Sequence, residues 1–207
     1  MATATAQAPV AVVEDVKGKP SGVEFMDYVA PGKVIKLGPK DTIVLGYMKS
    51  CWRETITGGT VVVGAEQSLV HDSDLERVKV DCHGAGRHVA DQKTQEGAAT
   101  VFRGMATSRP AVQPQVTIYG LSPILEVKGP GRLVIERLDK RGERQVLTIG
   151  KKSLLRGRFY DFAKAKKALT PGASYLARLG GQEVIFNVDP AAKPGATPVI
   201  SRLVRLE

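Results

Sequence analysis

Short apolar runs separated by turn residues dominate the chain from Val23 onward. VEFMDYV, KVIKL, TIVLGYM and TVVVG are rich in Val, Ile, Thr and Tyr, and Gly, Pro or Asp stands between them. This pattern is typical of strands in an antiparallel β module, and no long amphipathic helical pattern competes with it. The pair Gly58-Gly59 separates a strand expected to end near Ile56 from one expected to begin at Thr60, which predicts a tight hairpin there.

Strand patterns resume in the C-terminal half. Seven candidates with turns between them indicate a β-sandwich over residues 116–207: VTIYG, PILEVKG, GRLVIERLD, RQVLTIG, SYLARLG, QEVIFNVD and PVISRLVRL. MATSRPAVQPQ, residues 105–115, contains two prolines and predicts a stiff linker. Small residues over 1–22 leave little to bury, so we expect a flexible N-terminal segment. The sequence therefore predicts an all-β protein, with a small antiparallel β domain over 23–104 followed by the sandwich.

One corner of the C-terminal half carries a resemblance to a known family. LTPGASY, residues 169–175, is similar to the Leu-x-Pro-Gly-x-x-Tyr stretch before the sixth strand of fibronectin type III and related immunoglobulin-like sandwiches. The resemblance implies that Leu169 is a core residue and that Pro171 and Gly172 form the turn. It also implies that the Tyr175 hydroxyl bonds back to nearby backbone. A generic proline-glycine turn before a buried tyrosine is the alternative interpretation.

The N-terminal half carries a second resemblance. GKVIKLGPKDTIVLG followed by ITGGTVVVGAEQSLV resembles the periplasmic β domain of FecR-type proteins, which is often joined to an immunoglobulin-like C-terminal domain. The usual Gly-Asp-x-Val segment is represented only by PKDTIVLG, and the sequence shows no anti-sigma helix bundle. The resemblance thus implies an envelope β module and carries no anti-sigma activity over to this chain.

Charge and the first residues bear on partner and compartment. The chain of 207 residues has a net charge of +9, which predicts attraction to anionic partners such as another envelope protein or an anionic envelope polymer. No apolar run approaches the roughly 18–20 residues of a transmembrane segment. ATATAQA resembles the small-residue tail around a signal cleavage site, although no signal peptide stands before it. We therefore expect a periplasmic or otherwise exported protein, with a cytoplasmic location as the alternative.

Cysteine and histidine gather in VKVDCHGAGRH, residues 78–88. In an exported chain with two cysteines, the economical prediction is a disulfide between Cys51 and Cys82. A metal site made of Cys82, His83 and His88 is a second interpretation, but the spacing lacks the paired C-x-x-C or helical histidines of specific zinc motifs. A cysteine nucleophile with a histidine base is the third.

The stretch KKSLLRGRFYDFAKAKKAL is the strongest basic feature. Its cations form a candidate anionic-ligand patch: Lys151, Lys152, Arg156, Arg158, Lys164, Lys166 and Lys167. With Phe159, Tyr160 and Phe162 exposed, the stretch could stack on single-stranded nucleic acid. We favour a solvated loop and short helix, in which Phe159 and Phe162 share one helical face toward the core. The reason is that only 5% of the chain is aromatic and a sandwich needs those residues inside.

Other chemistry is sparse. The sequence has no nucleophile elbow, phosphate loop, dinucleotide fingerprint or His-Glu-x-x-His motif. The acidic residues Asp72, Asp74 and Glu76 lack the glycine and distal glutamate of a calcium loop and indicate a solvated turn. We therefore predict a non-catalytic exported bacterial envelope protein, acting as a binding or structural module without a cofactor. A basic nucleic-acid-binding protein is the alternative, and a Cys/His-dependent enzyme or metal protein is third.

Overall fold

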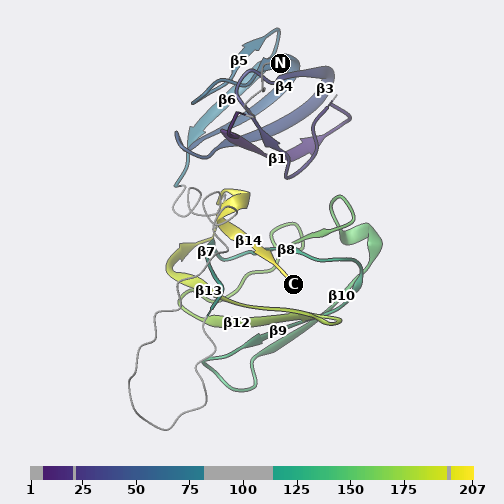
Figure 1. The fold of residues 1–207 in the computed structure, drawn as a ribbon, viewed down its shortest axis with the longest axis vertical. Helices are drawn as coiled ribbons and strands as arrows, with labels where there is room; N and C mark the ends of the chain where they lie inside the picture. The colour runs from purple at the N-terminus through teal and green to yellow at the C-terminus, as the bar shows by residue number, and fades with distance from the viewer. Residues whose placement is uncertain (1–6, 21, 82–113, 195–196) are drawn as a thin grey trace, which may run out of the picture. The chain divides into compact units, whose positions relative to one another are not determined.

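The computed structural model shows an all-β protein, as the sequence predicts (Figure 1). It describes four stretches of chain: residues 7–20, 22–81, 114–194 and 197–207. The chain divides into two compact units. The N-terminal unit contains the described residues as far as Asp81 together with 197–201, and the C-terminal unit contains 114–194 and 202–207.

The N-terminal unit is built on one antiparallel sheet. Its strand order is β2-β1-β3-β4-β5, with β6 also paired to β4. The strands are β1 (Ala11–Lys17), β2 (Tyr28–Val29), β3 (Val34–Tyr47), β4 (Trp52–Val62), β5 (Leu69–His71) and β6 (Asp74–Lys79). Alternate apolar residues of β3 and β4, among them Ile35, Ile43 and Ile56, are fully buried and form the core.

The prediction of a flexible segment over residues 1–22 is wrong for residues 11–17, which form a strand. Residues 11–17 form β1, which pairs with β3 from Ala11 opposite Tyr47 to Lys17 opposite Thr42. Ala11, Val12 and Val13 are fully buried. The burial of β1 comes from a partner strand some thirty residues away, and local composition carries no signal of that partner.

The predicted hairpin at Gly58-Gly59 is also wrong. Both glycines have left-handed φ values of 70° and 72°, as expected, but β4 continues through them. They lie opposite an irregularity in β3, where the register moves from Leu37 paired with Gly59 to Thr42 paired with Thr57. Two glycines in succession here absorb a bulge within a long strand pair, and the hairpin between β3 and β4 lies at residues 48–51.

The C-terminal unit is a sandwich of two sheets. The larger sheet has the order β10-β9-β12-β13-β7 and the smaller β11-β8-β14. The strands are β7 (Val116–Gly120), β8 (Ile124–Glu126), β9 (Gly131–Arg137), β10 (Arg144–Ile149), β11 (Phe159–Asp161), β12 (Ser174–Leu179), β13 (Gln182–Lys193) and β14 (Leu203–Arg205). Leu125 and Val204 from the smaller sheet share a core with Leu133, Ile135 and Phe186 from the larger. Two single turns of 3₁₀ helix, η1 (Lys151–Ser153) and η2 (Val199–Arg202), are the helices in the described stretches.

The expected short helix around Phe159 is absent from these residues. Phe159–Asp161 forms β11, which pairs antiparallel with β8. Phe159, Tyr160 and Phe162 are buried, as expected for a sandwich with so few aromatic residues. Phe159 and Tyr160 lie in β11, and Phe162 directly follows it. A three-residue strand whose consecutive side chains are all buried shows no period of two, so the pattern could not reveal it.

Candidate anion-binding surface

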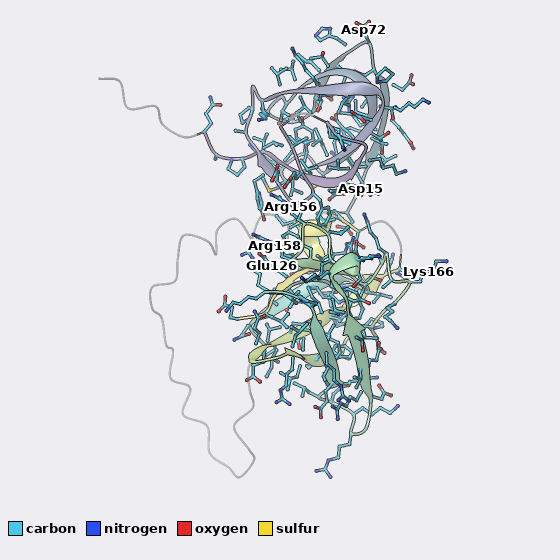
Figure 2. The ribbon with its side chains drawn as sticks, turned by 90° about the vertical axis from the view of Figure 1, so that its right-hand side faces the viewer. Asp15, Asp72, Glu126, Arg156, Arg158 and Lys166 are labelled. Carbon is cyan, nitrogen blue, oxygen red and sulfur yellow. The ribbon has the colours of Figure 1, made fainter. Side chains whose placement is uncertain are left out.

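The predicted basic patch is divided by β11. Lys151 and Lys152 lie in η1, while Arg156 and Arg158 precede β11. Three lysines follow β11: Lys164, Lys166 and Lys167. The basic residues before the three-residue strand β11 therefore lie at one of its ends, and the lysines after it lie at the other. Figure 2 shows Arg156 and Arg158 near Glu126, and Lys166 in a separate place on the C-terminal unit.

Arg158, just before β11, belongs to an ion-pair cluster with excess positive charge. Arg158 Nη2 lies 2.6 Å from Glu126 Oε1, and Arg205 Nε lies 3.0 Å from Glu126 Oε2. The Arg158 guanidinium also stacks 4.8 Å from the centre of the Phe159 ring. One carboxylate therefore serves two arginines that are both about half exposed, which leaves one positive charge uncompensated within the cluster.

The group after β11 lies on a fixed turn, which we call the lysine turn (residues 162–167). Asp161, at its start, accepts hydrogen bonds from Arg202 at 2.7 Å and 3.3 Å, and both side chains are almost fully buried. Arg202 Nη1 also donates to the Ser122 carbonyl at 2.9 Å, and the Ser122 hydroxyl donates to the Lys167 carbonyl at 2.6 Å. The residue that precedes the lysine turn therefore belongs to a buried ion pair. The other end of the turn is linked to the same pair through Ser122.

The lysine turn presents its cations outward. Lys164 and Lys166 are exposed and Lys167 is half-buried. Lys166 has a φ of 53°, in the left-handed region that non-glycine residues seldom adopt. The backbone under these cations is closed by turn hydrogen bonds, such as that from the Lys167 N–H to the Phe162 carbonyl at 2.8 Å.

The net positive charge of the protein belongs to its C-terminal half. Residues 114–207 contain 17 Lys and Arg against 8 Asp and Glu, a net charge of +9. Residues 1–113 contain 13 of each sign and are neutral overall. Any attraction of this chain for anions at a distance therefore originates from the part that forms the sandwich.

Buried carboxylates of the N-terminal unit are matched by arginines. Glu54, which is fully buried, accepts from Arg77 Nε at 2.7 Å and from the Ser68 N–H at 3.1 Å. The Ser68 hydroxyl shares a hydrogen bond of 2.9 Å with the Tyr47 hydroxyl, whose pKa is raised by burial. Glu14 forms the second such pair, 2.9 Å from an arginine on β4. Removing one partner of such a buried pair is strongly destabilising, because the other charge is then left buried without compensation.

Of the predicted cysteine and histidine site, the described residues contain Cys51. Cys82, His83 and His88 lie outside the described residues, so the disulfide stays a prediction. Cys51 lies in the turn before β4, and its carbonyl accepts from the Val80 N–H at 3.0 Å.

The acidic residues singled out in the sequence lie at the β5–β6 turn. Asp72 occupies the turn with a φ of 53°, and Asp74 and Glu76 lie in β6. In the parts of the chain that the structure describes, no three His, Cys, Asp or Glu side chains gather so that they could hold a metal ion.

At the predicted tyrosine corner, the Thr170 N–H donates to the Tyr175 hydroxyl at 2.9 Å. Leu169 and Tyr175 are both buried, and Gly172 has a φ of 72° in the turn. The corner thus fixes the entry of the chain into β12.

Sequence reasoning missed a cavity of about 330 Å³ between this corner and the β9–β10 hairpin. Arg137 reaches into it and pairs with Asp139 at 2.8 Å and with Glu143 at 2.9 Å. The hydrogen bond from Arg137 lowers the pKa of Asp139, and those from Lys140 and then Arg137 lower the pKa of Glu143. Arg137 and Lys140 are therefore paired with Asp139 and Glu143, whereas Arg141 and Arg144 add positive charge to the same hairpin.

Comparison with known protein families, with curated proteins and with solved structures found no match for this chain. Among the described residues, no helix has the length and apolar character needed to cross a membrane. Assignment of a function therefore depends on the residues and geometry set out above.

Proposed function

We propose that this chain is a non-catalytic bacterial envelope protein, exported to the periplasm, whose C-terminal unit binds an anionic partner. The observation that carries the proposal is the division of charge, with a net +9 on residues 114–207 and no net charge on residues 1–113. The partner is a carboxylate-bearing or phosphate-bearing molecule, either another envelope protein or an envelope polymer.

The arrangement of the cations supports binding as well as attraction. The lysine turn is held by the Asp161–Arg202 pair, so its backbone is ordered before a ligand arrives. Less conformational entropy is then lost on binding. Exposed lysines on an ordered turn suit contact with several anionic groups at once.

The alternative of single-stranded nucleic acid binding finds less support. Base stacking needs exposed aromatic faces, but Phe159, Tyr160 and Phe162 have only 2%, 8% and 0% of their surface exposed. The rings beside these cations are therefore committed to the core.

Strand order supports an immunoglobulin-like assignment of the C-terminal unit. The order β10-β9-β12-β13 corresponds to C′-C-F-G of such sandwiches, and the pairing of β8 with β11 corresponds to B with E. The tyrosine corner precedes β12, the F-strand equivalent. Immunoglobulin-like sandwiches serve many functions, so this assignment adds a binding scaffold and no activity. The FecR-type assignment of the N-terminal unit is supported by sequence alone.

The experiment is a binding titration of the full chain with two polyanions, poly-L-glutamate and polyphosphate. Ionic strength is varied from about 0.01 M to about 1 M, over which the Debye length falls from about 30 Å to about 3 Å. We expect binding to at least one polymer at low salt and a steep loss of affinity as salt rises. Absence of binding at the lowest salt, or binding that salt leaves unchanged, would overturn the proposal.

A further inference from the structure

The outer edge of β10 is an unpaired strand edge in the basic unit. β10 ends the order of the larger sheet and pairs with β9 alone (Figure 1). The pairing runs without a register shift from Arg144 opposite Glu136 to Ile149 opposite Gly131. β10 contains no proline and no bulge, the usual devices that prevent another strand from pairing with an edge.

The hydrogen-bond pattern shows which β10 groups face outward. The Arg137 N–H donates to the Glu143 carbonyl at 2.9 Å, so these two residues form a hydrogen-bonded pair at the start of the ladder. In an antiparallel ladder hydrogen-bonded and non-hydrogen-bonded pairs alternate. The N–H and C=O groups directed away from β9 are therefore those of Arg144, Val146 and Thr148. Within the described residues, no strand pairs with this side of β10.

We propose that this edge binds an extended acidic peptide, which adds a strand to the larger sheet beside β10. The proposal rests on the proposed function and names the partner class of that same basic unit. Positive charge stands at both ends of the edge, with Arg141 and Arg144 at its beginning and Lys151 and Lys152 just after its end. Six residues of strand span roughly 20 Å, so a peptide of similar length meets both groups.

The exposed side chains between these charges specify the middle of the peptide. Val146 is 43% exposed and lies between Arg144 and Thr148 on the outer face of the sheet. Cross-strand pairs favour β-branched or aromatic neighbours at such a position. The peptide that fits best has acidic residues near both ends and β-branched residues in the middle.

Charge disfavours a second copy of this chain as the occupant. Antiparallel pairing of two β10 strands would bring Arg144 of each copy beside Lys151 and Lys152 of the other, and like charges placed opposite one another are destabilising. The β6 edge of the N-terminal unit differs, because its charges are balanced along the strand: Asp74, Glu76, Arg77 and Lys79. β6 therefore serves as an internal control.

The first arm of the test uses the full chain and a synthetic acidic peptide with β-branched central residues. Two further peptides have the same side chains but carry backbone N-methyl groups on one or the other alternate set of residues. Only one set can face β10, so one N-methylated peptide should bind about tenfold or more weakly than the parent. The other should bind like the parent. Equal affinities of all three peptides would overturn the proposal.

Amide hydrogen exchange locates the bound peptide. We expect slower exchange at the amides of Arg144, Val146 and Thr148 in the presence of the peptide, and unchanged exchange along β6. Protection of β6 instead of β10 would overturn the proposal. Protection of β10 that rises with protein concentration without peptide would show a second copy as the occupant and would also overturn it.

The protein side is tested with Val146→Pro, which removes an outward N–H and leaves the β9 ladder intact. We expect this variant to bind the peptide about tenfold more weakly, while its circular dichroism and its affinity for poly-L-glutamate at low salt stay unchanged. If the variant fails to fold, the comparison of the N-methylated peptides alone tests whether the peptide adds a strand beside β10. Binding of poly-L-glutamate or polyphosphate without strand addition overturns only this inference. Absence of binding to the peptide and to both polymers at low salt overturns the proposed function as well.

Discussion

Replacement of Arg202 by methionine is the sharpest test of how the lysine turn is held. Arg202 donates to Asp161 at 2.7 Å and to the Ser122 carbonyl at 2.9 Å, and only 10% of its side chain is exposed. Asp161 has 4% of its side chain exposed. Arg202→Met therefore leaves a buried carboxylate without its cation.

The expected cost follows from that burial. Removing one partner of a buried ion pair typically lowers the free energy of unfolding by about 3–5 kcal/mol. For a domain of this size, each kcal/mol shifts the melting temperature by roughly 4–8 °C, so the C-terminal unit should melt lower by roughly 12 °C or more. Replacing both residues, as Asp161→Leu with Arg202→Met, removes the buried charge and should recover much of the loss.

Urea and thermal unfolding of the single and double variants, followed by circular dichroism, measure these differences. Arg158→Gln is the matched control, because Arg158 is more than half exposed in its ion pair with Glu126 and the pair should contribute at most about 1 kcal/mol. Equal losses for Arg202→Met and Arg158→Gln, or no recovery in the double variant, would refute the reasoning that the lysine turn is anchored by a buried charge pair.

Three further changes test other parts of the structure. Tyr175→Phe leaves the Thr170 N–H without its acceptor and should lower the free energy of unfolding by about 1 kcal/mol; an unchanged urea midpoint would contradict this. Gly59→Ala places a side chain against the backbone of the β5–β6 turn at a φ of 72°, so it should destabilise the N-terminal unit by more than about 1 kcal/mol, and a stabilised unit would contradict it. If Cys51 and Cys82 are joined, intact mass of non-reduced protein should show no alkylatable thiol, and reduction should cost about 2–4 kcal/mol; two reactive thiols in fresh protein would contradict the pairing.

The parts of the fold that the sequence could predict are those whose signal is local. Alternating runs such as GRLVIERLD and QEVIFNVD lie where strands β9 and β13 are found, and the LTPGASY motif marks the corner before β12. Three features of the fold were not predictable from the sequence, and for the same reason. The pairing of β1, the bulge at Gly58-Gly59 and the short strand β11 each depend on a partner distant in sequence.

The candidate site shows the same limit. Composition identifies the basic residues, but proximity in sequence does not place them together, because Arg158 and Lys164 lie on either side of the strand β11. The Asp161–Arg202 pair joins residues that are 41 positions apart, so no local sequence pattern predicts it. The unpaired edge of β10 is a property of sheet order, which periodicity within one strand cannot report.

The central claim, that the C-terminal unit binds an anionic partner, is tested most directly by two matched triple variants titrated with poly-L-glutamate across salt concentration. One replaces exposed lysines of the C-terminal unit: Lys151→Gln, Lys152→Gln and Lys166→Gln. The control replaces exposed lysines of the N-terminal unit: Lys33→Gln, Lys36→Gln and Lys40→Gln. Both lower the net charge equally. We predict that the first variant binds more weakly with a flatter salt dependence, while the control binds like the parent chain. Equal losses in the two variants, or a larger loss in the control, would contradict the account.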